Sequence, residues 1–504
     1  MVKNIVDILE ETERKFGDRT AYVDEDKSIT FSELKDHAQR IASGILDAAA
    51  IGTPVLVYMN KSVEVIESFL GAAYAGAFYV PIDINMPFQR VKLIIDTLAA
   101  RVVITRRKDE IPQEIMDTCT VFFYEDLCDG LLRDNEIADR QRKCIDTDPV
   151  YALFTSGSTG VPKGVLISHR SVLNLTRWLC ETFQITENEV FANQTPFYFD
   201  GSVKDIYATL FSGATMYIVP KKLFSLPKQL VNYLNDHRIN CIFWVPSVLC
   251  MIVNFRTFKT VKPMFLRKVF FSAEVMPTKQ FNMWKAALPD VMYTNLYGPT
   301  EATVDSIYYT VNRDFADDEA LPIGNACRNT DVLILDEQDR LIETPDQTGE
   351  ICVRGCSLAL GYYNNTERTN ESFVQNPLQN NYRELIYRTG DLGKYNAYGE
   401  IVFVGRKDFQ IKHMGHRIEL GEIEAAISSI SDVDRVCCLF EKKTQKIIAV
   451  YEGQIDQQAL SSQIREKLPS YMLPNVYRQL EKMPLNLNGK IDRVLLKQSI
   501  ISEE

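Results

Sequence analysis

Strand-like and helix-like segments alternate along most of this chain, and this alternation restricts its fold more than any other feature. Short apolar runs of strand length occur at 54–59, 78–82 and 102–105. The residues between them carry apolar side chains at helical spacing, and we expect Ser32 and Ser62 to cap two of these helices. Strands that alternate with helices pair in parallel, so the pattern predicts a layered α/β fold.

A second and smaller set of elements follows residue 417. Apolar residues at helical spacing occupy 420–430 and 460–468, and strand-like runs occupy 436–440 and 447–451. Together they form a stretch long enough to fold independently. We therefore expect a small α+β domain at this end of the chain.

A segment rich in glycine and charge, GRKDFQIKHMGHR at 405–417, marks the division between the two parts. The sequence predicts a large multi-layer N-terminal domain at 1–404, a hinge at 405–409 and a C-terminal domain at 410–504. The polar and charged stretch 125–148 is interpreted mainly as a surface connection.

Composition excludes several classes of protein. The formal net charge of -11 disfavours non-specific binding to nucleic acid or to an anionic membrane. The 11 cysteines show no CxxC spacing, which favours reduced thiols over a zinc site or paired bridges. The most apolar stretch, 69–82, is shorter than a spanning helix requires, and the first residues lack a secretory signal. We expect a cytoplasmic protein without membrane insertion.

The segment FTSGSTGVPKG at 154–164 carries the strongest chemical signal. Its glycines and its serine and threonine hydroxyls can converge on an anion, and Lys163 adds a positive charge. It is not a Walker A loop, because Pro162 precedes the lysine and Gly164 follows it. The segment predicts a phosphate-binding loop of another type.

This loop and a series of ordered motifs along almost the whole chain resemble the ANL superfamily of adenylate-forming enzymes, which includes acyl-CoA synthetases, nonribosomal-peptide adenylation domains and luciferases. The other motifs are ITFSEL (29–34), AGAFYVPID (75–83), NLYGPTEATV (295–304), GEICVRG (349–355), YRTGDL (387–392), GRKDFQIKHMGHRIELGEIE (405–424) and LNGKIDR (487–493). The resemblance implies a large N-terminal domain and a small mobile C-terminal domain, with ATP as a substrate and Mg²⁺ as a cofactor.

The same resemblance implies a nucleotide site. Tyr297 would stack on adenine, Asn295 would bond its exocyclic amine, and Asp391 with Arg406 would hold the ribose hydroxyls. An aromatic face suits a purine ring. The implied nucleotide-binding residues are Thr155, Ser156, Gly157, Ser158, Thr159, Gly160, Asn295, Tyr297, Gly298, Thr300, Asp391 and Arg406.

The implied catalytic groups are Lys163 and Lys490, with Glu301 as the Mg²⁺ ligand. A carboxylate suits a hard cation that is shared with phosphates. Attack of a carboxylate on phosphorus brings two anions together, and the lysines and the metal ion would offset that charge. Asp408 lies in the implied hinge, where the C-terminal domain would swing between two half-reactions.

The segment QTPFYFDGSVKDIY at 194–207 resembles the family segment that opens the acyl pocket. Asp200 falls where amino-acid-activating members bind the substrate's α-ammonium group. Lys204 and Asp305 are unusual charges in such a lining: either they pair with each other or one of them meets a polar substrate side chain. We expect them to pair, because a lone buried lysine is costly. Ser272-Ala273-Glu274 departs from the commoner Gly-Gly-Glu. The implied substrate-binding residues are Asp200, Gly201, Lys204, Trp244, Phe270, Ser272, Leu296, Val304 and Asp305, with Lys490 at the reacting carboxylate.

The bulky side chains of this lining suggest a small cavity, and its two charges suit a polar substrate. Together they predict a small or polar amino acid: D-alanine, alanine, serine, aspartate or glutamate. D-alanine–carrier protein ligases are similar in length and in the FDxSVxDIY pattern. No pantetheine attachment motif is present, so the acceptor is expected in trans, as the phosphopantetheine thiol of a separate carrier protein. Two alternatives stay open: an acyl-CoA ligase that uses coenzyme A, and a non-catalytic nucleotide-binding homologue.

Overall fold

The computed structural model describes residues 2–157, 161–407, 410–441, 443–485 and 491–501. The chain divides into two compact units. Unit 1 comprises Met1–Ile84, Leu98–Leu153 and Gly164–Lys407, and unit 2 comprises Asn85–Thr97, Phe154–Lys163 and Asp408–Glu504. The last boundary falls inside the predicted hinge, whereas the grouping of the two short segments with unit 2 was not predicted.

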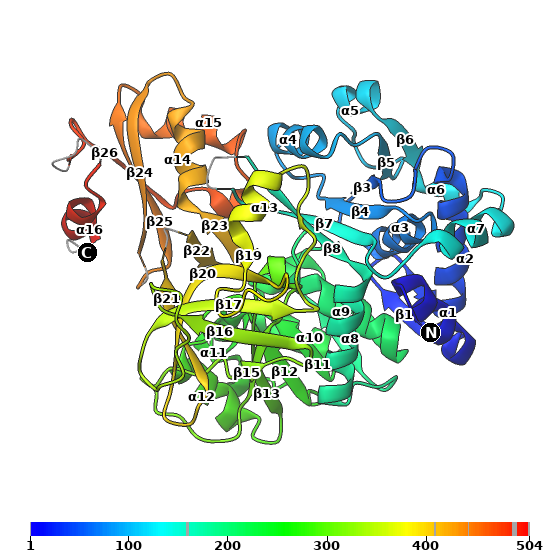
Figure 1. Cartoon of the computed structure of the whole chain (residues 1–504), viewed down its shortest axis with the longest axis horizontal. Coiled ribbons are helices and arrows are strands. Elements are labelled where there is room, and N and C mark those ends of the chain that lie inside the picture. Colours follow the sequence, from blue (N-terminus) through cyan, green and yellow to red (C-terminus); the bar gives the residue numbers. More distant parts are fainter. Residues whose placement is uncertain (1, 158–160, 408–409, 442, 486–490, 502–504) are drawn as a thin grey trace. The chain divides into compact units, whose positions relative to one another are not determined.

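Unit 1 contains a nine-stranded sheet (Figure 1). Its strand order is β15-β14-β13-β12-β11-β9-β10-β1-β2, and β9 to β13 run in parallel, as the alternation predicted. The strands are β1 (Thr20–Val23), β2 (Ser28–Thr30), β9 (Val190–Asn193), β10 (Thr215–Ile218), β11 (Cys241–Trp244), β12 (Lys268–Phe271), β13 (Met292–Tyr297), β14 (Ile307–Thr310) and β15 (Asn325–Ala326).

A second large sheet has seven strands, in the order β18-β8-β7-β4-β3-β5-β6. The glycine-rich loop joins β7 to β8, its neighbour in this sheet. A Walker A loop joins a strand to a helix, so the structure bears out the exclusion made from the sequence. The strands are β3 (Pro54–Tyr58), β4 (Phe78–Ile82), β5 (Val102–Thr105), β6 (Thr120–Phe123), β7 (Pro149–Thr155), β8 (Lys163–Ser168) and β18 (Gly361–Tyr362).

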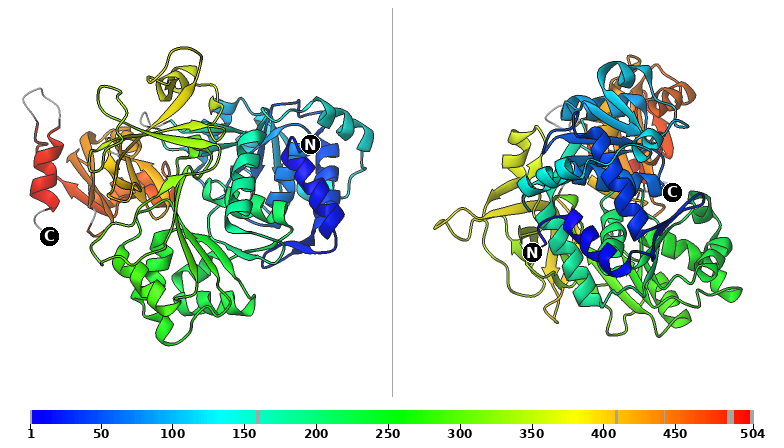
Figure 2. Two further views of the ribbon diagram at one scale, coloured as in Figure 1. Left: turned by 60° about the horizontal axis from the view of Figure 1, so that its bottom comes forward. Right: turned by 90° about the vertical axis from the view of Figure 1, so that its right-hand side faces the viewer.

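Helices cover both faces of the nine-stranded sheet (Figures 1 and 2). α8 (His169–Phe183) and α9 (Gly201–Ser212) share a core with both large sheets and with α1 (Ile5–Phe16), α2 (Phe31–Ile45) and α3 (Val63–Tyr74). The helices of the opposite face pack into a second core; they are α10 (Pro227–Asp236), α11 (Pro246–Asn254) and α12 (Thr278–Ala287).

The remainder of unit 1 is a small antiparallel sheet with short helices. The strands are β16 (Thr330–Leu335), β17 (Gly349–Gly355), β19 (Phe373–Gln375), β20 (Leu385–Tyr395) and β21 (Ile401–Arg406). The short helices are α5 (Gln113–Thr118), α6 (Tyr124–Cys128), α7 (Asp134–Lys143) and α13 (Thr366–Ser372), with 3-10 turns η1 (Lys221–Ser225), η2 (Thr257–Lys259) and η3 (Thr300–Ala302).

Unit 2 contains the expected small α+β set together with α4 (Phe88–Leu98), which ends in unit 1. α14 (Leu420–Ser428) and α15 (Gln457–Arg465) pack in one core with β24 (Val433–Glu441) and β25 (Lys446–Gly453). The sequence did not predict the hairpin of β22 (Gln410–His413) and β23 (His416–Glu419), nor β26 (Val476–Gln479), η4 (Ser470–Met472) and α16 (Arg493–Ile501).

Two local predictions were wrong. Thr30, not Ser32, caps α2: its hydroxyl accepts the Glu33 N–H, and the Glu33 carboxylate accepts the Thr30 N–H at 2.9 Å. This capping box satisfies two end groups at once, so the helix begins one residue before Ser32. The stretch 125–148 is not mainly connection, because α6 and α7 occupy much of it and each buries an apolar side chain, Leu127 and Ile137.

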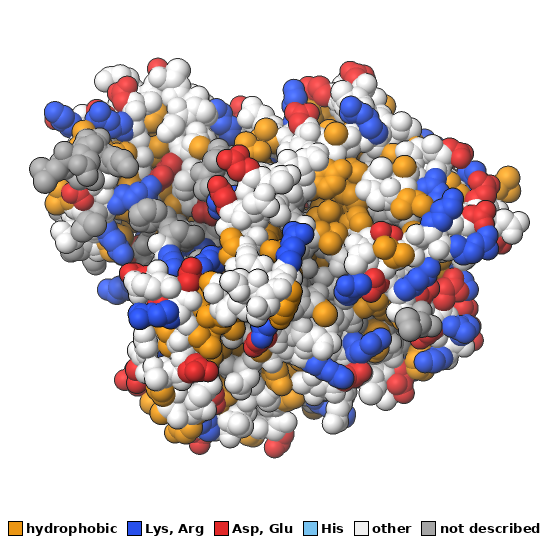
Figure 3. Space-filling view, viewed as in Figure 1, with side chains coloured by type: hydrophobic (Ala, Val, Ile, Leu, Met, Phe, Trp, Pro, Cys, Tyr) orange, Lys and Arg blue, Asp and Glu red, His pale blue; other side chains and the backbone are white. Residues whose placement is uncertain are grey.

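Two further observations concern the surface charges and the membrane-spanning capacity of the helices. Over the described residues of the face in Figure 3, acidic and basic side chains are interspersed. Within the described part of the chain, no helix has the length and apolar character needed to cross a membrane.

Candidate active site

Asp200 lies directly before α9, in the turn that joins β9 to that helix. Its Oδ2 accepts a hydrogen bond of 2.7 Å from the Thr300 hydroxyl. Burial raises the pKa of Asp200, and the Thr300 hydrogen bond and the charge of Lys204 oppose the rise. Gly201 packs closely, since a Cβ there would lie 3.2 Å from the Thr195 side chain. Asp200 is thus a carboxylate in a poorly solvated place, which suits a cationic ligand group.

Lys204 and Asp305 pair as the sequence predicted. The Lys204 ammonium lies 3.4 Å from the Asp305 carboxylate, and the two side chains are 2% and 1% exposed. The same ammonium donates to the Ser272 hydroxyl at 2.9 Å and lies 5.8 Å from the centre of the Phe243 ring. Burial raises the pKa of Asp305, while Lys204 lowers it.

Apolar side chains surround this pair. Phe243 stacks on Phe270 with ring centroids 4.4 Å apart, and both share a core with Leu296 and Val304. Trp244, which was predicted to line the pocket, belongs to the other core: its Nε1 donates to the Ala192 carbonyl at 2.8 Å.

Strand alternation explains why Phe243 and not Trp244 lies beside Lys204, because neighbouring residues on β11 face opposite sides of the sheet. Phe243 is the neighbour of Lys204 on β11 that the sequence analysis missed. The period-two alternation of β11 was the signal that could have found it.

Two residues, which follow Ser272 and precede Asp305 in the chain, adopt left-handed backbone conformations that side chains disfavour. Ala273 has φ 72°, at the position where the sequence departs from Gly-Gly-Glu. Val304 has φ 71°, and a β-branched residue in this region is strained. Gly298 faces this turn so closely that a Cβ would lie 2.3 Å from the Val304 carbonyl oxygen. The backbone of the YGPTEATV segment is therefore tightly constrained.

The residues predicted to bind the nucleoside lie together in unit 1. The Tyr297 hydroxyl donates to Asp391 Oδ2 at 2.5 Å, and Arg406 pairs with the other oxygen of that carboxylate. Asp391 and Arg406 are cross-strand partners on β20 and β21. The Asn295 amide donates to the Pro322 carbonyl at 2.8 Å. Burial and the Asp391 charge raise the pKa of Tyr297.

Glu301, the predicted Mg²⁺ ligand, is fully buried on η3 and accepts a hydrogen bond of 2.7 Å from the Tyr362 hydroxyl. Among the described residues there is no group of three or more acidic, histidine or cysteine side chains placed to hold a metal ion. Mg²⁺ is held by one or two carboxylates together with substrate phosphates, so a lone buried carboxylate fits it.

In unit 2, the described part of the glycine-rich loop has features of an anion site. The hydroxyl of Thr155 is buried and has no partner among the described residues. A Cβ on Gly157 would lie 2.1 Å from the Val161 carbonyl oxygen, so only glycine fits. The Gly157 N–H donates to a carboxylate oxygen of Glu422 at 3.2 Å, and Ser156 donates to the Arg417 carbonyl at 2.9 Å.

A carboxylate already accepts from one loop N–H, which shows that the loop tolerates an anion there. Glu422 also pairs with Arg90, and both side chains are buried. Lys163 begins β8 and is 8% exposed. The predicted residues Ser158, Thr159, Gly160, Asp408 and Lys490 lie outside the described residues.

Comparison with known families identifies the class of protein. A family model described as "AMP-binding enzyme" matches residues 9–363. The chain belongs to this family and is an adenylate-forming ligase of the ANL type that uses ATP.

Two relatives are similar in sequence to this chain over nearly its whole length. The chain is 32% identical to tyrocidine synthase 1 of Brevibacillus parabrevis, over 98% of this chain and 45% of that protein. It is 31% identical to a D-alanine–D-alanyl carrier protein ligase of Bacillus cytotoxicus, over 96% of this chain and 97% of that protein. The chain thus spans less than half of the first relative and nearly the whole of the second.

Solved structures show the same fold. Holo-PA1221, described as a nonribosomal peptide synthetase protein containing adenylation and carrier (PCP) domains, matches with a TM-score of 0.85 at 24% identity, over 99% of this chain and 84% of that one. IdnL1 matches with a TM-score of 0.81 at 26% identity, over 96% of this chain and 98% of that one.

Proposed function

We propose that this ligase activates a small neutral amino acid as its aminoacyl adenylate and passes the aminoacyl group to the phosphopantetheine thiol of a separate carrier protein. The charges of Asp200, Lys204 and Asp305 are the main support for an amino acid as the substrate. With Asp200 and Asp305 ionised, Lys204 offsets one negative charge and leaves one. The α-ammonium group of an amino acid supplies the missing positive charge.

The pairing of Lys204 also narrows the side chain of the substrate. Of the amino acids that the sequence suggested, aspartate and glutamate would need a free cation, and Lys204 already contacts Asp305 and Ser272. The Phe243 and Phe270 rings limit the space beside the pair. Alanine of either hand and serine remain as the proposed substrates, in keeping with the similarity to a D-alanine–D-alanyl carrier protein ligase.

The chemistry proceeds in two half-reactions. A carboxylate oxygen of the amino acid attacks the α-phosphorus of ATP, and the bond to the bridging oxygen breaks to release pyrophosphate. The thiolate of the carrier then attacks the acyl carbon, and AMP leaves with the electron pair. We assign Lys163 and Lys490 to offset the charge on the phosphoryl oxygens.

Other residues of the chain bind and orient the nucleotide. Asp391 and Arg406 would hold the ribose hydroxyls, and Tyr297 would both fix Asp391 and present its ring to adenine. Glu301 would hold Mg²⁺, which supplies electrostatic stabilisation of the phosphates when bound.

The domain assignment belongs to the same proposal: 1–404 binds both substrates, 405–409 is the hinge, and 410–504 delivers Lys490. Similarity to a protein described as a carrier protein ligase, and to structures described as containing carrier domains, supports a carrier as the acceptor.

ATP–pyrophosphate exchange tests the first half-reaction. A panel of glycine, both alanines, serine, aspartate, glutamate, a fatty acid and an aryl acid should give exchange with alanine or serine. Asp200→Asn should abolish it, and Asp314→Asn, at an exposed aspartate paired with Lys285, should not. Exchange with the fatty or aryl acid alone would refute the amino-acid assignment. Exchange with no acid would favour a non-catalytic homologue.

Mass spectrometry tests the second half-reaction. A carrier protein bearing phosphopantetheine should gain the aminoacyl mass when it is incubated with enzyme, ATP and the amino acid. A thioester that forms on coenzyme A and not on the carrier would support the acyl-CoA ligase alternative.

A further inference from the structure

Lys61 is a charged residue that the reaction described above does not use. It lies between the end of β3 in the seven-stranded sheet and the start of α3. Its ammonium donates to the Asn193 carbonyl at 3.4 Å and to the Gln194 carbonyl at 3.2 Å, and it lies 5.3 Å from the centre of the Phe197 ring. Asn193 ends β9 in the nine-stranded sheet. Lys61 therefore links the carboxyl ends of strands from both large sheets.

The segment that Lys61 contacts leads directly to Asp200, the carboxylate that we assign to the α-ammonium group of the substrate. Residues 194–199 run from β9 to Asp200, and the Phe199 N–H bonds the Pro196 carbonyl at 3.0 Å within this turn. The two carbonyls and the aromatic ring described above converge on the Lys61 ammonium group. All three are groups that attract a cation, so the charge of Lys61 holds this end of the turn in place.

Asp205 contacts the same end of β9 that Lys61 contacts. Its Oδ2 accepts from the Asn193 amide at 2.5 Å, and it lies one turn into α9, whose first residue follows Asp200. Burial lowers the pKa of Lys61 to about 7, against the charge of Asp205, and burial raises the pKa of Asp205 to about 7. The two groups thus interact in a place with little water, where an electrostatic contact is stronger than it would be at the surface.

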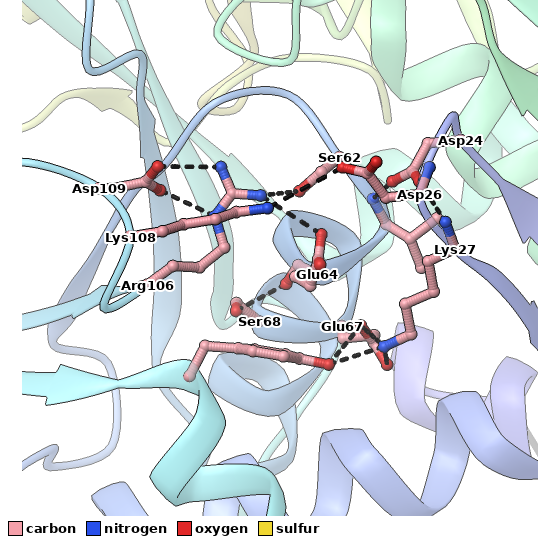
Figure 4. Close-up of polar contacts among 12 residues, drawn as sticks. Asp24, Asp26, Lys27, Ser62, Glu64, Glu67, Ser68, Arg106, Lys108 and Asp109 are labelled. Carbon is pink, nitrogen blue, oxygen red and sulfur yellow. Dashed lines mark hydrogen bonds and ion pairs between the residues drawn. The ribbon is translucent and has the colours of Figure 1, made fainter.

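The residues next to Lys61 provide a firm anchor. Ser62 and Glu64, at the start of α3, face the Arg106 guanidinium (Figure 4). The guanidinium donates to the Ser62 hydroxyl at 3.4 Å and lies 3.6 Å from the Glu64 carboxylate. The Val63 N–H bonds Asp24 at 2.7 Å. The backbone that carries Lys61 is therefore held by groups outside the amino-acid pocket, and it can position the turn without depending on it.

We infer that Lys61 is a positioning residue for the amino-acid substrate: it holds the turn that places Asp200 and acts on amino-acid binding without touching the nucleotide. The inference rests on the proposed function, because Asp200 is assigned there to the α-ammonium group.

Steady-state exchange kinetics of Lys61→Met test this inference. The KM for the amino acid should rise at least about tenfold, the scale of one charge-assisted hydrogen bond, while the KM for ATP stays within about twofold. Lys61→Arg keeps the charge and should restore most of the affinity. Lys61→Gln is a milder variant that serves if the methionine variant does not fold.

Lys3→Met is the matched control. The Lys3 ammonium also donates to two backbone carbonyls, those of Gln141 at 2.6 Å and Cys144 at 3.1 Å, and neither partner is a proposed substrate-binding residue. Its loss should leave both KM values unchanged. If Lys61→Met (or Lys61→Gln) and Lys3→Met change the amino-acid KM equally, or if the ATP KM rises by the same factor, Lys61 is merely structural and the inference is wrong.

The same data separate this inference from the proposed function. If the wild type exchanges only with a carboxylic acid that lacks an amino group, the proposed function is wrong. In that case the Lys61 inference is also wrong if Lys61→Met leaves the KM for that acid unchanged. If wild type exchanges with alanine or serine and Lys61→Met does so with unaltered KM, the inference alone fails.

Discussion

The buried pair of Lys204 and Asp305 allows a quantitative test of the pocket. Lys204→Met leaves the Asp305 carboxylate without its cation at 1% exposure, and Asp305→Leu leaves the ammonium with Ser272 and an aromatic ring. Removing one partner of a buried pair costs about 3–5 kcal/mol, because the other charge stays desolvated. Replacing both partners with apolar groups of similar volume costs little. The double variant should therefore be more stable than either single variant.

Urea unfolding followed by tryptophan fluorescence measures this effect. The chain has 3 tryptophans, Trp178, Trp244 and Trp284, and all of them lie in unit 1, which contains the pair. The fluorescence change therefore reports the unfolding of that unit. The midpoint shift at constant m-value gives the change in the free energy of unfolding for each variant.

An exposed pair provides the control for the cycle. Lys222 and Glu25 lie 2.7 Å apart with side chains 70% and 56% exposed, so Lys222→Met and Glu25→Gln should each change stability by less than about 1 kcal/mol. Single variants of Lys204 and Asp305 that cost under about 1 kcal/mol each, or a double variant that equals their sum, would refute the charge argument on which the substrate assignment rests.

Three further predictions follow from single residues. Lys204→Ala should gain pyrophosphate exchange with 2,4-diaminobutyrate, because its side-chain ammonium can pair with Asp305; a panel that stays limited to neutral amino acids would contradict this. Burial lowers the pKa of His169 to about 4, so the stability it contributes is present above its unfolded pKa of about 6.5 and is lost as the pH falls toward 4. Between pH 7 and pH 5 the wild type should lose about 2 kcal/mol more than His169→Gln in urea titrations, and equal losses would exclude His169 as the cause. Ala273→Gly should stabilise unit 1 by about 1 kcal/mol, since φ 72° suits glycine, and an unchanged or lower urea midpoint would show that the conformation is not strained.

Several site predictions came from motifs whose members are close together in the chain. In YGPTE, Gly298 and Glu301 lie three positions apart, and the turn that presents them is a local matter. The order of such motifs identified the adenylate-forming class, and the family comparison confirmed it. The helices and strands of the first hundred residues were likewise found from their apolar period, as α2, β3, β4 and β5 show.

Other features depended on contacts between distant segments. Lys204 and Asp305 are 101 positions apart, and Lys61 and Asn193 are 132 apart. Pairing of the first two was an expectation from the cost of a buried charge, but nothing in the sequence pointed to Lys61. Its partners are backbone carbonyls, which every residue possesses and which leave no mark in the residue pattern.

By itself, the sequence determined the class of the protein and the order of the main helices and strands of its first hundred residues, because these depend on local spacing and on residue chemistry. The tertiary structure decided that Phe243 and not Trp244 faces Lys204, since the side of β11 that meets the pocket depends on which helices cover each face of the sheet. It also decided that Lys61 reaches the turn before Asp200, because two separate sheets must pack together before their strand ends can meet.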